Sequence, residues 1–149
     1  MEQGRVLAVC ISERKGERKK AIDRGLLIEN FGLQGDAHAG DWHRQISLLG
    51  DESVDKMRAA GLDVGAGDFA ENLTIVGINL PALPIGTYLR VGSVALLEVT
   101  QIGKECHQHC AIYQQVGDCV MPREGIFARV LRGGPVSKDD AVIVVRAGA

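Results

Sequence analysis

The sequence has few aromatic residues and no excess of charge of either sign. Aromatic side chains make up 4% of the 149 residues, so a surface that binds nucleic acid by base stacking would have few rings to use. Seventeen lysines and arginines against nineteen acidic residues leave a formal charge of -2, which creates no field to attract phosphate backbones or acidic membrane surfaces. Nucleic acids and membranes are therefore not expected partners.

Long apolar runs and a dense cysteine framework are also missing. No run approaches the roughly 20 apolar residues of a membrane-spanning helix. The apolar stretch at residues 6–11 is too short for the core of a secretory signal and has no cleavage signature. The four cysteines are too few and too unevenly spaced for a disulfide-rich secreted fold. We therefore expect a protein of the reducing cytoplasm with free thiols.

The chain has the length of one ordinary domain, and no internal repeat or low-complexity linker divides it. We expect a single domain over residues 1–149. Short strands separated by glycine and proline turns are typical of an all-β barrel or sandwich. Apolar and β-branched runs predict these strands at residues 5–12, 46–49, 73–76, 87–91, 94–100 and 141–145.

One helix is predicted, with Asp51 as its N-cap and Gly61 as its stop. Charged residues 13–20 predict a loop, and the strands in the middle of the chain predict a β-meander. Residues 126–131 fit either a strand or a helix, and the Gly-Gly-Pro sequence at residues 133–135 predicts a turn.

The densest group of reactive side chains is the sequence KECHQHC at residues 104–110, directly after a predicted strand. A cysteine acts as a nucleophile only as its thiolate. Lys104 and the two neighbouring histidines would lower the pKa of a thiol, whereas Glu105 would oppose this. Cys106 is therefore a candidate nucleophile. The alternative is a packed or idle thiol, which is also the interpretation favoured for Cys10 in its apolar strand.

The same segment could instead bind zinc, because thiolates and imidazoles are zinc ligands. The residues available are Cys106, His109, Cys110 and Cys119. Their spacing is imperfect, since a CxxxC sequence with two histidines inside it is not the paired CxxC of a structural zinc site. A zinc-stabilised structural domain therefore stays an alternative.

Two further segments carry polar side chains among glycines. In residues 35–44, His38 and Arg44 could donate hydrogen bonds to a phosphate or another oxyanion, although the same segment also fits a turn in which Asp36 caps local amides. In residues 67–74, Asn72 stands at the start of a predicted strand. A structural role for its amide, bonded to the backbone of a neighbouring loop, is favoured there.

Taken in order, these segments resemble the MOSC domain family, named after the C-terminal domain of molybdenum-cofactor sulfurase. The resemblance covers nearly the whole chain, which looks like a short stand-alone member. It rests on the order of several motifs rather than on any one of them. These motifs are GLQGDAHAG at residues 32–40, GDFAENLT at residues 67–74, the glycine-bounded strand at residues 86–92, TQIGKEC at residues 100–106 and GIFARV at residues 125–130.

The resemblance implies a mainly β, barrel-like fold with one or two short helices. It also implies a cysteine that carries sulfur as a persulfide, which Cys106 matches, and the binding of a molybdenum-pterin cofactor. His38 and Arg44 match the histidine and the basic residue of the family's glycine-rich loop. Lys19, or its neighbour Lys20, is the candidate for a basic residue that belongs to the site in some relatives. Asn72 is a further candidate contact to the cofactor.

The implied partners are a cysteine desulfurase and the proteins that make or accept the molybdenum cofactor. Pyridoxal phosphate belongs to a separate domain of the larger sulfurases, so it is only a family label here and no binding is expected. Gly103 and Glu105 stand where relatives often have Arg and Pro, which weakens the expected anion contacts. Cys110 and Cys119 could resolve a persulfide as a disulfide.

The sequence leaves four hypotheses for the activity. The leading one is a sulfur carrier or transfer domain that uses Cys106. The second is a binding or delivery module that holds the molybdenum-pterin cofactor without chemistry. The third, which the resemblance to some relatives implies, is a reductase of N-hydroxylated compounds that needs the bound cofactor. The zinc-stabilised structural domain is the fourth.

Overall fold

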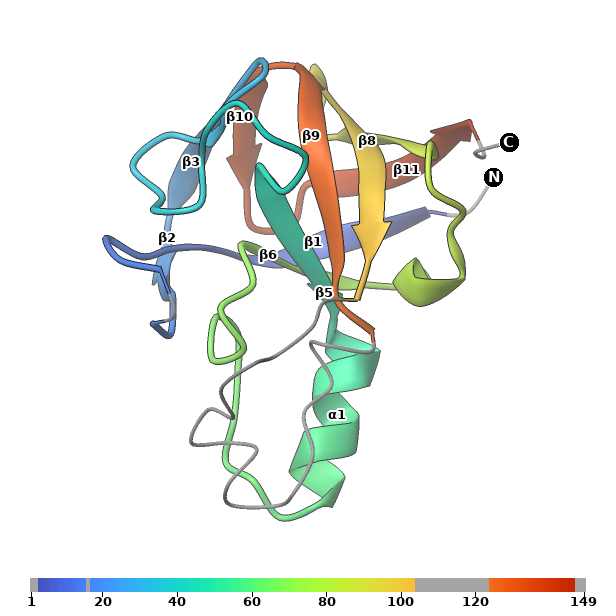
Figure 1. Ribbon diagram of the computed structural model, residues 1–149. Coiled ribbons are helices and arrows are strands. Elements are labelled where there is room, and N and C mark those ends of the chain that lie inside the picture. The colour runs from blue at the N-terminus through green and yellow to red at the C-terminus, as the bar shows by residue number, and fades with distance from the viewer. Residues whose placement is uncertain (1–2, 16, 104–123, 147–149) are drawn as a thin grey trace.

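The computed structural model describes residues 3–15, 17–103 and 124–146 (Figure 1). Short strands dominate it, with one α-helix, α1 (Asp51–Ala59), and one 3-10 helix, η1 (Leu80–Ala82). In chain order the strands are β1 (Gln3–Ile11), β2 (Lys20–Ile22), β3 (Arg24–Ile28), β4 (Gly32–Leu33), β5 (Ile46–Gly50), β6 (Leu73–Val76), β7 (Tyr88–Val91), β8 (Ala95–Ile102), β9 (Ile126–Arg132), β10 (Gly134–Ser137) and β11 (Ala141–Arg146).

Seven strands form a closed barrel. Their order is β11-β7-β8-β9-β5-β6-β1, and β1 pairs back onto β11 with Gln3 opposite Ile143. The far end of β1 pairs with β2, which lengthens the sheet beyond the barrel. Closure removes the free edges that an open sheet would present. The prediction of a mainly β, barrel-like fold with one or two short helices is confirmed, and the sandwich alternative is excluded.

The helix α1 belongs to the one parallel crossover of the barrel. It connects β5 to β6, which pair in parallel, and it lies below the barrel in Figure 1. All five residues of β5 are buried because the barrel core covers one face of the strand and the helix covers the other. Leu48 packs in the barrel core, whereas its neighbour Leu49 packs in the cluster under the helix.

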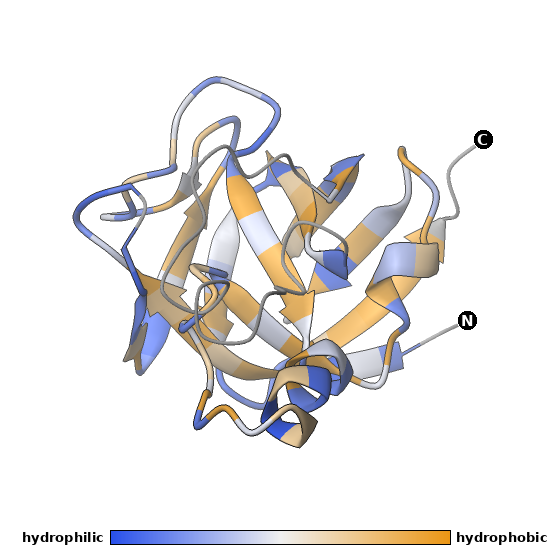
Figure 2. Ribbon diagram, turned by 60° about the horizontal axis from the view of Figure 1, so that its bottom comes forward, coloured by the Kyte–Doolittle hydropathy of each residue, from blue (hydrophilic) through white to orange (hydrophobic). Residues whose placement is uncertain are grey.

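Apolar side chains fill the interior of the barrel, and hydrophobic residues recur along its strands in Figure 2. The second cluster lies between the helix and the barrel wall and consists of Leu49, Val54, Met57, Leu62, Val64, Phe69 and Phe127. Alternation along the strands sends every second side chain into the barrel, so the barrel core follows from the period of two in the sequence. The second cluster combines outward-facing strand residues with apolar residues of α1 and of the segment after it.

A small second sheet supports the glycine-rich loop, which we define as residues 34–44. Its strand order is β10-β3-β4, with Leu27 of β3 opposite Gly134 on one side and Leu33 on the other. The loop leaves this sheet at the end of β4 and returns to the barrel at β5. Both ends of the loop are therefore anchored in hydrogen-bonded strands.

Four predictions of local structure need correction. Residues 133–135 are not simply a turn, because β10 begins at Gly134; Pro135 fits there since β10 is an edge strand that needs no amide donor on its free side. The meander begins only at β7, because β6 pairs with β5 and β1. The N-cap of α1 is Gly50, so that Asp51 is the first helical residue and its charge complements the helix dipole. Within residues 13–20, Lys20 already belongs to β2.

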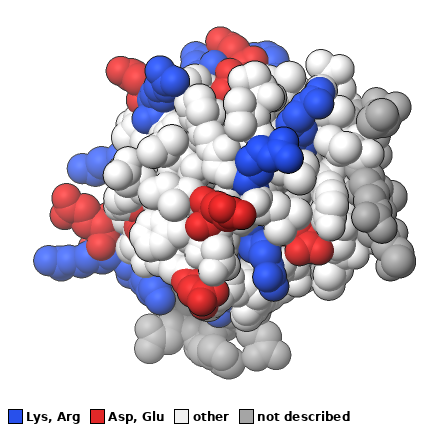
Figure 3. Space-filling model, turned by 90° about the horizontal axis from the view of Figure 1, so that it is seen from above, with Lys and Arg blue, Asp and Glu red and all other residues white. Residues whose placement is uncertain are grey.

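Of the two alternatives left open for residues 126–131, the structure shows the strand, since these residues form most of β9. On the face seen from above, acidic and basic residues are interspersed without one dominant sign (Figure 3). Among the described residues, no helix has the length and apolar character that crossing a membrane requires.

Candidate functional site

A hollow of about 240 Å³ lies where the loop after β1 meets the glycine-rich loop. Three of the residues that line it have basic side chains, Lys15, His38 and Arg44, and the other two are the aromatic residues Trp42 and Phe127. We call this the Arg44 hollow. It brings together two of the residues that the sequence nominated, His38 and Arg44, with three that it did not.

Behind the hollow, Lys19 and Asp36 form an ion pair whose two side chains have no solvent exposure. The Lys19 Nζ atom lies 2.8 Å from Asp36 Oδ1, 3.0 Å from Ser12 Oγ and 3.1 Å from His38 Nδ1. An ammonium has three protons, and this one has three neighbours that can accept them. Lys19 therefore contacts the hollow through His38 rather than directly.

The carboxylate of Asp36 connects three pieces of backbone and side chain. Its Oδ1 also accepts the Ser12 amide at 3.0 Å, and its Oδ2 accepts the His38 amide at 3.1 Å. Burial by itself raises the pKa of Asp36, but the hydrogen bonds from Lys19 and the Ser12 amide outweigh it and hold the pKa below its ordinary value. Asp36 is thus the anionic centre of the site.

His38 is held from three directions. Its ring meets Lys19, its amide bonds to Asp36, and its carbonyl accepts the Trp42 Nε1 proton at 2.8 Å. The indole of Trp42 therefore lies against the same turn. Lys15 Nζ lies 4.9 Å from the centre of the Trp42 ring, within the range of a cation-π contact.

The guanidinium of Arg44 contacts two aromatic rings. Its Cζ lies 4.8 Å from the ring centre of Trp42 and 5.5 Å from that of Phe127. Its Nε is buried and has no hydrogen-bond partner among the residues that the structure describes. A buried donor without a partner costs about 1–3 kcal/mol, so native structures keep such groups rare. An anionic ligand in the hollow would supply the missing hydrogen-bond acceptor for Arg44 Nε.

The backbone of Lys19 is fixed by a second loop, residues 65–70. The Lys19 amide donates to the Gly67 carbonyl at 2.8 Å. Gly67 has a φ of +83°, and a Cβ atom there would lie 2.2 Å from the Lys19 carbonyl oxygen. Only glycine allows this approach, because any side chain would collide with the backbone it supports.

Asn72 lies deeper, fully buried between β1 and β5. Its Oδ1 accepts the Ser47 amide and its Nδ2 donates to the Cys10 carbonyl, both at 3.0 Å. It does not line the Arg44 hollow. Next to it, burial raises the pKa of the Glu71 carboxyl, and burial together with Glu71 and Asp68 raises the pKa of the Cys10 thiol to about 12. Cys10 is therefore a protonated, packed thiol.

The other nominated residues that the structure describes do not line the hollow. Lys20, the alternative to Lys19, is exposed on β2. The candidate nucleophile and the alternative zinc ligands, Cys106, His109, Cys110 and Cys119, lie outside the described residues. Within the described part of the chain, no group of three His, Cys, Asp or Glu side chains could hold a metal ion.

The sequence did not identify Lys15, Ser12, Trp42 or Phe127. The sequence predicts Asp36 only as a cap for local amides, a role it does perform for Ser12 and His38. One signal was available for Trp42, since it is the one tryptophan of the chain and stands inside a polar loop where a core residue is not expected. No pattern within a short window would have linked Phe127 to that loop.

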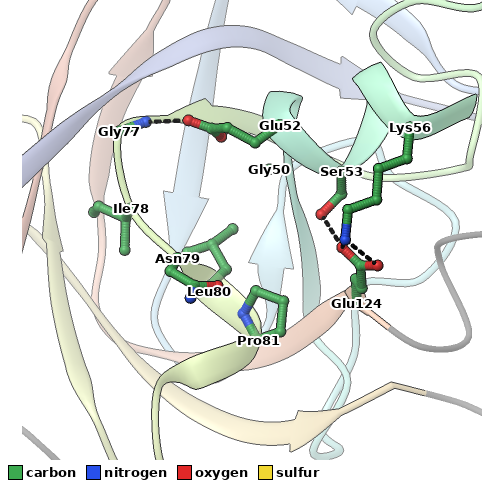
Figure 4. Close-up of a pocket in the computed structure, with 10 residues that line it drawn as sticks. All are labelled: Gly50, Glu52, Ser53, Lys56, Gly77, Ile78, Asn79, Leu80, Pro81 and Glu124. Atoms are coloured by element: carbon green, nitrogen blue, oxygen red, sulfur yellow. Dashed lines mark hydrogen bonds and ion pairs between the residues drawn. The ribbon is translucent and has the colours of Figure 1, made fainter. Parts of the chain in front are cut away.

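A second hollow, of about 350 Å³, lies at the start of α1 (Figure 4). Its charged groups are already engaged with one another. The Glu124 carboxylate accepts the Ser53 hydroxyl at 2.6 Å and the Lys56 ammonium at 2.8 Å, and Glu52 accepts the Gly77 amide at 2.9 Å. These contacts stabilise the helix start, and among the described residues this hollow has no buried side-chain donor without a partner. The Arg44 hollow is therefore the better candidate site.

Comparisons with known proteins agree with this architecture. The family model of the MOSC domain matches residues 34–143. The fold is similar to that of the YuaD protein from Bacillus subtilis, with a TM-score of 0.78, 19% identity and 94% of each chain covered. YiiM from Geobacillus stearothermophilus gives a TM-score of 0.71 at 19% identity, over 95% of this chain and 75% of that one. YiiM from Escherichia coli gives 0.67 at 20% identity, over 97% and 71%. No curated protein matches by sequence.

The Gly67 contact predicts a graded series of glycine substitutions. Gly67→Ala combines a positive φ with a backbone collision and should lower the free energy of unfolding by about 3 kcal/mol or more. Gly61→Ala has a φ of +98° but open space, so strain alone should cost about 1 kcal/mol. Gly65→Ala has neither problem and should change stability by less than about 0.5 kcal/mol. Urea denaturation measures all three, and equal losses at Gly67 and Gly61 would contradict the collision.

The Lys19–Asp36 pair predicts an acid-dependent loss of stability. The folded-state pKa of Asp36 lies below its ordinary value of 3.8, so its stabilisation is complete above that value and is lost as the pH falls through the folded-state pKa. Asp36→Asn should cost about 3–5 kcal/mol at neutral pH, because it leaves a buried ammonium without its counter-charge. That cost should shrink in acid below about pH 4. Urea denaturation across this range tests it against exposed Asp63→Asn, for which a constant, small effect is expected.

Proposed function

This chain belongs to the MOSC domain family, which is linked to the molybdenum cofactor, and we propose that it binds the phosphate-bearing end of a molybdenum-pterin cofactor in the Arg44 hollow and carries sulfur on Cys106. One observation carries the binding part of the proposal: Arg44 Nε is buried without a partner among the described residues. A phosphate oxygen is the kind of acceptor that would complete it.

The hollow has the charge and donors that a phosphate requires. Arg44 and Lys15 supply two cations, and His38 adds an imidazole at the same wall. Guanidinium groups bind phosphate oxygens well because their donors are rigid and planar. The contacts of Arg44 with Trp42 and Phe127 hold that plane in one orientation, so little conformational freedom is lost on binding.

These residues would bind and orient the cofactor rather than react with it. When bound, the cofactor would supply a redox-active molybdenum centre. Arg44 and Lys15 would neutralise the phosphate, and His38 would donate or accept one further hydrogen bond. Trp42 and Phe127 would keep water away from the guanidinium, because both rings lie against it.

The sulfur step would take place on Cys106. Its thiolate would attack the outer sulfur of a persulfide on a cysteine desulfurase, the S–S bond of the donor would break, and the donor cysteine would leave as a thiolate. Cys106 would then carry one additional sulfur as its own persulfide. Support comes from the sequence, where Lys104 and two histidines surround Cys106 and favour the thiolate.

The end of β8 lends further support to a shared site. Thr100, six residues before Cys106, donates from its hydroxyl to the His43 carbonyl, and the same hydroxyl lies 3.2 Å from the Phe127 carbonyl. The chain that leads to Cys106 therefore leaves the barrel beside the residues that carry Arg44. This starting point at Thr100 is compatible with a sulfur carrier and a cofactor-binding hollow that serve one reaction.

A non-catalytic binding or delivery module is the second candidate function. It is favoured by the composition of the hollow, because Lys15, His38 and Arg44 already supply donors for a phosphate without a contribution from Cys106. Among the described residues the one cysteine is Cys10, and burial raises its pKa to about 12, so it offers no nucleophile. The two functions differ in whether Cys106 is needed.

Replacing Arg44 tests the binding site. Arg44→Met should lower the occupancy of the molybdenum-pterin cofactor about tenfold or more, because a charge-assisted hydrogen bond contributes about 1.5–3 kcal/mol. The protein is produced in cells that make the cofactor, and the molybdenum content and the fluorescence of the released, oxidised pterin are measured per chain. Arg129→Met is the control, since Arg129 is exposed on β9. Undiminished occupancy in Arg44→Met would rule out this hollow.

Replacing Cys106 tests the sulfur carrier. After incubation with a cysteine desulfurase and cysteine, native mass spectrometry should show a mass gain of one sulfur atom in the wild type and in Cys119→Ser. Cys106→Ser should show no gain, because a hydroxyl cannot form a persulfide. A gain in Cys106→Ser equal to that of the wild type would reject the carrier function. If the Arg44 result holds in that case, the binding module becomes the function.

A further inference from the structure

The contacts behind the Arg44 hollow assign a positioning role to Lys19: we propose that it fixes His38 as a neutral imidazole with its proton on Nε2, so that the ring meets an anionic ligand as a hydrogen-bond donor. The tautomer follows from the contacts of this chain alone. Its use in binding an anion rests on the proposed function. Lys19, nominated from the sequence as a direct contact of the cofactor, would then act through His38.

The Lys19 ammonium has three protons to donate and three neighbouring acceptors. Its nitrogen lies 2.8 Å from Asp36 Oδ1 and 3.0 Å from Ser12 Oγ. The Ser12 hydroxyl lies 3.0 Å from the Arg14 carbonyl, to which it donates its one proton, so it meets Lys19 with a lone pair. Two of the three ammonium protons are therefore used by these oxygens, and the third is left for His38.

The ring of His38 meets this ammonium with its Nδ1 nitrogen. Its Nδ1 lies 3.1 Å from the ammonium, which has no lone pair and can only donate. Nδ1 must therefore be the unprotonated nitrogen, and the proton of the neutral ring is on Nε2. A second proton on Nδ1 would bring two donors together and would add a positive charge beside Lys19.

Buried hydrogen bonds hold both Lys19 and His38 in place. Lys19 and Asp36 have no side-chain exposure, so the ammonium cannot turn toward water. The same Asp36 carboxylate accepts the His38 amide at 3.1 Å, so Asp36 holds both the Lys19 ammonium and the His38 backbone. On the other side, Gly67 accepts the Lys19 amide. Neither partner can move without breaking a buried hydrogen bond.

The charges around the hollow favour the same state. Lys15 and Arg44 line it together with His38, and Lys19 lies directly behind. An imidazolium would be one more cation in a group that has Asp36 as its buried anion. A neutral ring with Nε2–H instead offers a donor without added repulsion. The site would then favour ligand groups that accept hydrogen bonds, such as phosphate oxygens, over groups that donate them.

Nitrogen NMR of histidine-labelled protein tests the tautomer directly. At neutral pH the wild-type His38 ring should show Nδ1 in the range of an unprotonated nitrogen and Nε2 in the range of a protonated one, with the resonances assigned by their loss in His38→Gln. Protonation at Nδ1, or at both nitrogens, in the wild type would overturn the proposal. This measurement needs no variant at Lys19 and therefore holds even where Lys19→Met does not fold.

Two variants separate positioning from general structure. Lys19→Met removes the donor, so the His38 signals should move toward a mixture of tautomers or toward Nδ1–H. Ser12→Ala removes another partner of the same ammonium and leaves the contact with His38, so its His38 signals should match the wild type. The backbone amide spectrum reports whether each variant is folded. A folded Lys19→Met with wild-type His38 signals would also overturn the proposal.

Titration with inorganic phosphate distinguishes this inference from the proposed function. In the wild type, phosphate should shift the Nε2 resonance of His38, and Lys19→Met should bind phosphate about fivefold more weakly, the equivalent of one hydrogen bond. If the tautomer is as proposed but phosphate leaves Nε2 unchanged, the positioning role holds and the anion site is rejected. If phosphate binds through the hollow while Nδ1 carries the proton, the anion site holds and the positioning role is rejected.

Discussion

A buried ammonium must find acceptors for all of its protons, and this requirement at Lys19 organises the candidate site. Water cannot help, since neither Lys19 nor Asp36 exposes its side chain. The acceptors come from different segments: Ser12 follows β1, and Asp36 and His38 belong to the glycine-rich loop. A buried pair of this kind adds little net stability over an apolar pair, but loss of either partner is expensive. It therefore fixes where the loops meet more than it strengthens the fold.

The barrel supplies the frame on which those loops can be fixed. Closure between β1 and β11 leaves the end of β1 free to pair with β2 and to present Ser12 at the rim. The small sheet holds one end of the glycine-rich loop, and β5, buried on both faces, holds the other. Asn72 joins the two barrel strands beneath, with its amide bonded to the backbones of Cys10 and Ser47. The polar contacts at the rim are thus supported by the hydrogen bonds of Asn72 to the backbones of β1 and β5.

Much of the fold could be predicted from the sequence because strand periodicity is local. The runs that became β1, β5, β6, β7, β8 and β11 are apolar, β-branched and bounded by turn residues. Their partners are not local: nothing near Leu73 indicates that β6 joins β5 in parallel rather than β7. The strand at Gly134 was missed because its glycine and proline favour a turn, and only its place at a sheet edge makes the proline acceptable.

The candidate site also has residues that could be predicted from the sequence and contacts that could not. His38 and Arg44 could be nominated from residue type alone, as donors among glycines, and they do share one hollow. The ion pair between Lys19 and Asp36 could not be predicted in this way, because the two residues are 17 positions apart and the sequence offers other lysines as partners. The packing of Phe127 on Arg44 depends on a strand from the far end of the sequence. Sequence reasoning therefore missed Lys15, Trp42 and Phe127 in the lining of the hollow and Ser12 behind it, because each comes from a segment that only the folded chain brings to the glycine-rich loop or carries no distinctive local pattern.

The position of Trp42 has an optical consequence. It is the chain's one tryptophan, so the indole emission of the protein comes from a single ring. That ring has cationic groups of Lys15 and Arg44 within 4.9 Å of its centre, and its Nε1 proton is bonded to the His38 carbonyl. The excited state of an indole responds to nearby charge, so any ligand that draws Arg44 or Lys15 toward itself changes the field on the chromophore. The molecule carries its own fluorescent reporter inside the hollow, with no label to attach.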